Sequence, residues 1–197
     1  MISDEMLVKQ VLGGDSTSYE DIVNRYKNTV FAIIYRMVGQ YQDAEDISQD
    51  VFVNVYRKLY QFDTDKKFGP WIHRIAVNTC ISYLRKRSKV VSISFDESYM
   101  QQYEEETASW SVSPQTEMEK AELKKEVEKA INELSDAYKL LIVLRYQMEY
   151  SNQEIADILG ISKENVEVKT HRARKALRKI IQNKMAERGS IYELSAN

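Results

Sequence analysis

The sequence predicts an all-α protein made of two small helical domains joined by a flexible acidic linker. Among its 197 residues there are only 6 glycines and 2 prolines. Folds rich in strands need many turns, so this scarcity favours helices. Apolar residues recur at helical spacing in two blocks, one before about residue 90 and one after about residue 116. The segment between them has acids and serines but few aliphatic residues and no clean period, which is typical of a linker.

Composition excludes several classes of protein. The hydrophobic content is 43% and the charged content 29%, which are ordinary values for a soluble globular chain. The single cysteine, Cys80, cannot form an internal disulfide, which fits a reducing cytosol and a cytoplasmic protein. The first ten residues lack the apolar core of a signal peptide, and no apolar run approaches the roughly 18 residues of a membrane span.

Two helices are expected early in the first half, over residues 13–39 and 43–62. The first begins after a Gly-Gly pair and a Ser/Thr cluster, and Gly39 ends it. The second has an apolar stripe and, on another side, an acidic face of Asp43, Asp46, Asp50 and Asn54. This face is a solvated surface, a docking site for a basic partner or a metal site. We discount the metal, because helical carboxylate sites normally add an inward Glu-x-x-His.

Residues 66–89 hold seven Lys or Arg and no acid, although the whole chain has a formal charge of −2. Pro70 suits the first turn of a helix, whose inward stripe is Ile72, Ile75, Ala76, Thr79 and Tyr83. A separate face carries Trp71, Arg74, Asn78, Ser82 and Arg85. Cations that follow phosphates and rings that stack on bases are how proteins hold single-stranded DNA. The alternative is that Trp71 and Phe68 belong to the core and that the cations solvate a helix end.

The second half is expected to contain four helical segments. Residues 117–134 are amphipathic, residues 137–150 are apolar nearly all round, and the third segment starts with a capping box of Ser151 and Glu154. Gly160 stops the third segment, and Ser162 caps a last, long helix. The inner side of that helix carries Val166, Thr170, Ala173, Leu177 and Ile181. The tail after it is too short to fold alone.

The last two segments have the spacing of a helix-turn-helix. Ala156 is small where two helices cross, Gly160 makes the turn, and Ile161 and Val166 seat the second helix. Residues 163–188 hold nine Lys or Arg against three Glu, as expected for a helix in the major groove with cations on the phosphates. An ordinary helical hairpin with a solvated basic end is the alternative.

No pattern in the sequence indicates catalysis. His73 and His171 each stand alone on a basic helix without a Cys/His cluster, so no zinc site and no other metal or cofactor is expected. There is no Ser/His/Asp ordering and no Gly-rich phosphate loop. We therefore expect a protein that is not an enzyme and has no small-molecule substrate.

The ordered motifs resemble a bacterial RNA polymerase sigma factor of the compact extracytoplasmic-function (ECF) group. They are "DAEDISQDVFVNVYRKLYQF", "KFGPWIHRIAVNTCISYLRKR", the acidic segment and "SNQEIADILGISKENVEVKTHRARKALRK", and the resemblance covers roughly residues 5–185. It implies sigma region 2 over residues 1–90, an acidic linker over 91–115, sigma region 4 over 116–188 and a tail over 189–197. The implied role is transcription initiation in a stress response. The implied partners are core RNA polymerase (β′ clamp helices and β flap), promoter DNA and an anti-sigma factor that is often membrane-bound.

The resemblance also assigns roles to residues. The β′ clamp helices would bind Asp43, Glu45, Asp46, Gln49, Asp50 and Asn54. The minus-ten element would be opened, and an extruded base held, by Phe62, Asp63, Lys66, Lys67, Phe68, Trp71, Arg74, Asn78 and Arg85. The minus-thirty-five element would be recognised by Lys163, Glu167, Val168, His171, Arg172, Arg174 and Lys175. The linker would thread toward the polymerase active centre, where its acids imitate nucleic acid.

The sequence departs from the family pattern at three positions. Ser82 stands where many relatives have Asp, and Glu167 and Val168 replace a basic and a small polar residue at the start of the recognition helix. Glu167 can accept a hydrogen bond from cytosine N4, or it can pair with Lys163 or His171 and never touch DNA. Two other functions are weighed against a sigma factor. They are a conventional helix-turn-helix regulator that does not bind polymerase, and an enzyme acting on nucleic acid, which would need acids on the DNA side.

Overall fold

The computed structural model describes residues 2–87 and 117–195, with side chains for 2–87 and 121–186. Within these ranges all regular structure is helical, as predicted. The first half contains α1 (Asp4–Leu12), α2 (Thr17–Val38), α3 (Tyr41–Lys58), η1 (Leu59–Gln61) and α4 (Phe68–Arg87). The second half contains α5 (Glu117–Asn132), α6 (Asp136–Ile142), η2 (Val143–Gln147), α7 (Asn152–Leu159) and α8 (Lys163–Ser195). The predicted linker 91–115 lies outside the described residues.

Local signals in the sequence explain most helix ends. Ser3 accepts a hydrogen bond from the backbone N–H of Met6 and so caps α1. Gly39 ends α2 in the left-handed conformation, with a φ of 76°, and its N–H donates to the carbonyl of Tyr35. Ser151 and Glu154 form both bonds of the predicted capping box on α7, and Gly160 ends that helix at a φ of 67°.

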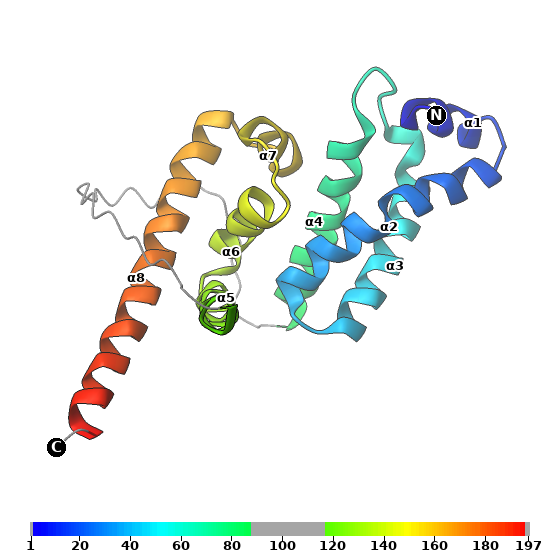
Figure 1. Ribbon diagram of the computed structural model, residues 1–197. Coiled ribbons are helices and arrows are strands. Elements are labelled where there is room, and N and C mark those ends of the chain that lie inside the picture. Colours follow the sequence, from blue (N-terminus) through cyan, green and yellow to red (C-terminus); the bar gives the residue numbers. More distant parts are fainter. Residues whose placement is uncertain (1, 88–116, 196–197) are drawn as a thin grey trace.

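The two halves lie side by side, with α6 and α7 of the second half beside α2 and α4 of the first (Figure 1). The buried apolar residues of both halves belong to one continuous cluster. Lys139 of α6 is buried, and its Nζ donates to the backbone carbonyl of Met37, 2.8 Å away, at the end of α2. Burial raises the pKa of the Cys80 thiol on α4 to about 12, and Lys139 lies near enough to oppose that shift. The second half therefore covers a side of α4 that the predicted inward stripe did not include.

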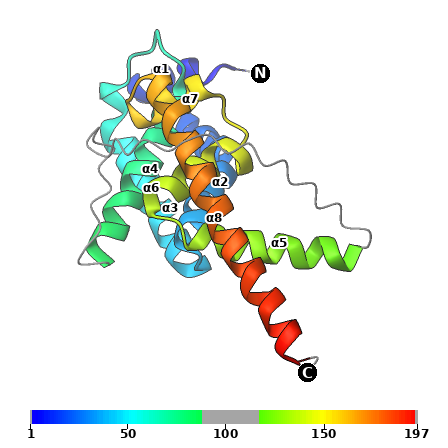
Figure 2. The same cartoon turned by 90° about the vertical axis from the view of Figure 1, so that its left-hand side faces the viewer.

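Three elements differ from the prediction. Residues 4–12 form a helix that periodicity did not reveal, with Leu7 and Val8 fully buried. The apolar segment 137–150 is divided into α6 and a π-helical turn, η2. The predicted tail is not separate, because α8 continues through it to Ser195 and projects beyond the other helices (Figure 2). A helix that already exists can extend at low cost, since only its nucleation is unfavourable.

Candidate nucleic-acid interface

Three aromatic side chains close the core beneath the loop that joins η1 to α4. The rings of Phe62, Phe68 and Trp71 contact one another, with centroids 5.2 to 5.4 Å apart. Phe68 is fully buried and Phe62 is 6% exposed, whereas Trp71 is half-buried at the rim. In this arrangement Phe68 is covered on all sides and Phe62 reaches only the edge of a cleft, so the expectation that these two rings contact DNA stays a prediction. Of the three, Phe62 and Trp71 line a cleft at the surface, and Trp71 is the more exposed.

The cations of this region are displayed on the loop and along one side of α4. Lys66 and Lys67 are exposed in the loop, and Arg74, Asn78, Ser82 and Arg85 are exposed on α4, as predicted. Asp63 shapes the loop, since its carboxylate accepts from the N–H of Asp65, its carbonyl accepts from the N–H of Lys66, and it pairs with the Lys66 ammonium at 3.7 Å. Within residues 66–87 this surface carries no acid.

The predicted acidic face of α3 is divided by the packing of α4 against it. Asp50 and Asn54 line a groove between α3 and α4 that also contains Asn78. Asp43 lies near the end of this groove and pairs with Arg87, whose Nη1 is 2.6 Å from Oδ2. The remaining three predicted partner contacts, Glu45, Asp46 and Gln49, are exposed. Asp50 is exposed as well, so four of the six predicted partner contacts are accessible, whereas Asp43 and Asn54 are half-buried.

The helix-turn-helix has the geometry that the sequence predicts. Ile155, Ala156 and Val166 are buried, and the N–H of Asn165 donates to Oγ of Ser162 at the start of α8. Glu167 lies 3.9 Å from the Lys163 ammonium and accepts from the Asn152 side-chain amide at 3.2 Å. Val168, His171, Arg174 and Lys175 are exposed, while Arg172 is half-buried. Glu167 therefore makes the pair with Lys163 that was one of its two predicted roles.

The helix-turn-helix also lies against the cationic surface of α4. A cleft is lined on one side by loop and α4 residues and on the other by α7 and the turn: Gln61, Phe62, Asp63, Lys66, Lys67, Pro70, Trp71, Arg74, Ala156, Asp157, Gly160 and Ile161. The guanidinium of Arg74 is so close to Gly160 that a Cβ there would be 2.7 Å from Nη2. The two sides of this cleft belong to the two regions that are expected to bind separate DNA elements.

A buried imidazole marks the same contact between the halves. His73 of α4 shares a hydrogen bond with the hydroxyl of Tyr150, 3.1 Å from Nδ1, in the segment before α7. Burial lowers the pKa of His73 to about 4, so the imidazole is neutral at neutral pH. The hydroxyl of Tyr150 is also desolvated, which raises its pKa to about 12.

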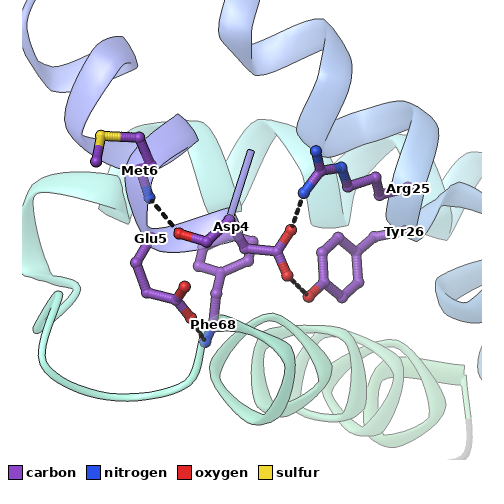
Figure 3. Close-up of polar contacts among 7 residues, drawn as sticks. Asp4, Glu5, Met6, Arg25, Tyr26 and Phe68 are labelled. Carbon is purple, nitrogen blue, oxygen red and sulfur yellow. Dashed lines mark hydrogen bonds and ion pairs between the residues drawn. The ribbon is translucent and has the colours of Figure 1, made fainter. Parts of the chain in front are cut away.

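Residues of α1 that sequence analysis did not single out contact the start of α4 (Figure 3). Glu5 accepts a hydrogen bond from the backbone N–H of Phe68, the first residue of α4, at 3.3 Å. The two carboxylate oxygens of Asp4 accept from Arg25 and from the Tyr26 hydroxyl, each at 2.6 Å. The Tyr26 ring in turn packs edge-on against Phe68. The available signal was a pair of acids directly after a capping serine, which marks a helix start but does not identify a distant partner.

A basic helix-turn-helix next to a second cationic helix defines a DNA-binding protein, and comparison with known proteins specifies its family. The model of Sigma-70 region 2 matches residues 22–90, and that of Sigma-70, region 4 matches residues 124–177. The ECF RNA polymerase sigma factor SigW of Bacillus subtilis is 35% identical over 175 residues, which are 87% of this chain and 93% of that protein. The ECF RNA polymerase sigma-E factor of Escherichia coli K12 is 32% identical over 178 residues, or 89% and 93%.

Solved structures share the fold at lower identity. CnrH, in complex with the cytosolic domain of CnrY, has a TM-score of 0.64 at 24% identity and covers 92% of this chain and 99% of its own. RpoE of Bartonella quintana, in complex with the anti-sigma factor NepR, has a TM-score of 0.58 at 20% identity and covers 83% and 96%.

The chain belongs to the ECF group of RNA polymerase sigma factors. Proteins of this group are transcription initiation factors that bind core RNA polymerase and direct it to promoters, and this is the function of the chain. A conventional regulator that acts without polymerase is not favoured, because both sigma regions are present. Among the described residues, no helix is both long and apolar enough to cross a membrane.

Proposed function

We propose that the two halves recognise the two promoter elements separately, with residues 1–90 acting on the minus-ten element and 116–188 on the minus-thirty-five element. Residues 91–115 would be the linker, and the tail 189–197 would begin as an extension of the recognition helix, which the structure describes to Ser195. The observation that carries this proposal is the presence of two cationic helices, α4 and α8, which lie in different structural surroundings. The α4 surface is acid-free and has a half-buried Trp71 at its rim, which suits unpaired bases. The α8 surface follows a helix-turn-helix, which suits duplex DNA.

The minus-ten contacts would come from exposed residues of the loop and of α4, together with the half-buried Trp71. They are Asp63, Lys66, Lys67, Trp71, Arg74, Asn78 and Arg85. Phe62 and Phe68 would support this surface from beneath, because both rings are buried against Trp71. Asn78 is exposed at the α3–α4 groove, where its amide can donate to or accept from a base edge.

The minus-thirty-five contacts would come from the first turns of α8. Val168, His171, Arg174 and Lys175 are exposed there, and Arg172 projects from the same helix. Lys163 and Glu167 neutralise each other in part, so Glu167 would tune the charge of the helix start.

Simultaneous binding of both elements requires the halves to separate. Arg74 lies against Gly160, and Trp71 shares a cleft with α7, so in the described arrangement the two surfaces face each other instead of two separate DNA segments. The promoter-bound form would therefore be a more open arrangement of the same two units, held apart by the polymerase.

The polymerase-binding face would consist of the exposed side of α3, with Glu45, Asp46 and Gln49 at its centre. Asp50 is exposed and would join them, whereas Asn54, half-buried in the α3–α4 groove, and Asp43, paired with Arg87, would contribute more to the shape of region 2. The β flap of the polymerase would bind the second half.

Further aspects of the function follow from the family. The chain would have no catalytic activity of its own, since the polymerase supplies the chemistry, and it would act in the cytoplasm. Because CnrH and RpoE are seen in complex with CnrY and the anti-sigma factor NepR, an anti-sigma factor is a partner of this chain in our proposal.

Run-off transcription with purified core polymerase tests this function. The full chain should direct initiation from specific genomic fragments, and Asp46→Lys should reduce its affinity for core polymerase several-fold because a charge at the rim of the contact is reversed. Asp21→Lys is the matched control, since it reverses an exposed acid on α2 away from this face. Equal core affinity of both variants would refute the assignment of the face, and absence of promoter-specific transcripts would refute the function.

A further inference from the structure

The loop between η1 and α4 is held at both of its ends by α1. Before the loop, α1 packs against η1. After the loop, the Glu5 carboxylate of α1 accepts from the N–H of Phe68 at 3.3 Å. The loop carries Asp63, Lys66 and Lys67, which belong to the proposed minus-ten surface. The N-terminal helix α1 therefore contacts the chain on both sides of this loop, at η1 and at Phe68, and Figure 3 shows the contact with Phe68.

The bond from Glu5 replaces a local helix cap that the loop does not supply. The first N–H groups of a helix have no partner inside the helix and are usually satisfied by a neighbouring Ser, Thr, Asp or Asn. The residue before α4 is Lys67, whose side chain carries no acceptor. A carboxylate is the strongest available acceptor for such a group, because its charge also complements the positive end of the helix dipole.

Asp4 fixes the position of α1 from which Glu5 reaches Phe68. Its two oxygens bind Arg25 and the Tyr26 hydroxyl of α2, so α1 cannot slide along α2 without breaking both bonds. Burial, followed by the bond to Asp4, raises the pKa of Tyr26, which therefore remains a hydrogen-bond donor at neutral pH. The Tyr26 hydroxyl also lies 3.5 Å from the place a Cβ would take on Gly69, so this ring packs closely against the first turn of α4.

The start of α4 is linked to the exposed surface through aromatic rings. Phe68 is fully buried and packs on one side against Tyr26, at 5.5 Å between centroids, and on the other against Trp71, at 5.4 Å. A shift of the Phe68 backbone would therefore move Trp71 and the end of the loop together, since a close-packed core transmits such displacements.

We infer that Glu5 is a positioning residue for base selection: it sets the loop and Trp71 in the geometry that selects the extruded base of the minus-ten element. Asp4 and Tyr26 hold Glu5 in place. The inference rests on the proposed action of α4 at the minus-ten element, and it adds a residue that does not itself touch DNA. The expected consequence of losing Glu5 is weaker discrimination among bases. Polymerase binding should be unchanged, because the proposed polymerase-binding face lies on α3 and not on α1.

The test uses full-length chain assembled with core polymerase and a single-stranded minus-ten oligonucleotide library with one randomised base. Glu5→Ala removes the acceptor and should reduce the preference for the best base over the next by about three- to tenfold, the range expected for losing one ordinary hydrogen bond, since the bond to Phe68 is long. Glu5→Gln retains a neutral acceptor and should restore part of the preference. Affinity for core polymerase should stay at the wild-type value in both variants.

Ser3→Ala is the matched control, because it removes the cap of α1 itself and leaves Glu5 in place. It should lower the unfolding temperature of the chain, as Glu5→Ala does, but keep the base preference. A preference in Glu5→Ala equal to wild type overturns the inference. So does an equal loss in Ser3→Ala, which would make α1 a general stabiliser. If Glu5→Ala does not fold, Glu5→Met, which keeps the length of the side chain but has only a weak acceptor, decides the question by the same criterion. A wild-type complex with no base preference would instead overturn the proposed role of α4, and this inference with it.

Discussion

The two cationic helices of this sigma factor, α4 and α8, differ in how much of their surface the rest of the chain covers. On α8, most of the side chains expected at the minus-thirty-five element are exposed, and Val168 keeps about half of its surface exposed, although Arg172 is half-buried. On α4, the first turns face α7, so that Arg74 contacts Gly160 and Trp71 lies in a shared cleft. Both helices are rich in Lys and Arg, but only α8 has its proposed DNA-binding side uncovered by the rest of the chain.

This difference has a physical basis in what each helix offers for packing. The first turns of α4 present aromatic rings and a neutral His73 as well as cations, and such a mixed surface can be covered at low cost. The exposed side of α8 is mainly charged and would lose much hydration on burial. A surface built for unpaired bases, which must be both cationic and apolar, is therefore also one that another part of the protein can cover.

The largest effect is expected on the open helix. Arg172→Ala should weaken binding of the minus-thirty-five duplex by about 1–3 kcal/mol and relax the preference at one base pair, if the guanidinium is bidentate to a guanine. Titration of a randomised duplex library with the full-length chain measures both quantities. Lys179→Ala, two turns further along α8 and exposed, should leave the preferred sequence unchanged. Uniform weakening with a salt slope lower by about one would show that Arg172 contacts only phosphate.

The covered helix can be tested at Gly160, where backbone strain and contact with Arg74 coincide. Gly160→Ala should destabilise the chain by about 1–2 kcal/mol, because a side chain is unfavourable in the left-handed region, and should in addition displace Arg74. Gly39→Ala is the matched control, since Gly39 has a similar φ of 76° and nothing within 4 Å of the added Cβ. Urea unfolding of both variants, each with and without Arg74→Ala, isolates the contact. Equal costs at the two glycines in every background would show that Arg74 does not restrict Gly160.

Acidification should weaken the covered helix through His73. In the unfolded chain His73 has an ordinary pKa of about 6.5, whereas burial lowers it to about 4 in the folded chain. The contribution of neutral His73 to the free energy of unfolding is therefore fully present above about pH 6.5 and is lost as the pH falls toward 4. The loss is on the order of 1 kcal/mol by pH 5.5. Tyr150 and Tyr26 face the imidazole, and Glu154 is close enough to oppose the shift.

Denaturant unfolding between pH 7 and pH 5 checks this dependence. His73→Gln keeps a group that can donate or accept toward Tyr150 but does not titrate. The variant should show a flatter decline of the free energy of unfolding than wild type, with carboxylates supplying the remainder. Identical slopes for the two proteins would mean that His73 is not the group that links stability to pH.

The covered state of α4 also shows what the sequence could and could not predict. Periodicity and caps located most helices, because Gly39, the Ser151–Glu154 box and Gly160 act on their own neighbours in the chain. The helix at residues 4–12 was missed, since nine residues give too short a window for an apolar period. The continuation of α8 to Ser195 was missed because it depends on the helix before it.

The exposed charged residues of the candidate site could be predicted from the sequence. The residues whose position depends on packing could not. The exposure of Arg74, Asn78 and Arg85 follows from their spacing, and the structure shows it. The burial of Phe68 could not be decided, because a buried ring and a stacking ring have the same identity and spacing. Contacts between residues far apart in sequence, such as Asp43 with Arg87 and Glu5 with Phe68, depend on the tertiary fold.

The smallest effect is expected at Glu167, where the open helix departs from the family pattern. Its carboxylate is 3.9 Å from the Lys163 ammonium and accepts from Asn152, and the pair is exposed, so its contribution to stability is about 0.2–0.5 kcal/mol. Glu167→Lys should replace this attraction with repulsion and lower the free energy of unfolding by a similar amount. It should also tighten binding to every duplex, because one more cation lies near the phosphates.

A duplex library with a randomised minus-thirty-five element separates this general effect from base recognition. An unchanged preferred sequence with uniformly tighter binding is the expected result, since the carboxylate is engaged with Lys163 and Asn152 on the protein. Glu167→Gln serves as the control, because it removes the charge but keeps an acceptor for Asn152. A change of preference at a single base pair in Glu167→Lys, absent in Glu167→Gln, would instead show that the carboxylate leaves Lys163 and accepts from a cytosine amino group. In that case the open helix would, like α4, have to rearrange before it binds DNA.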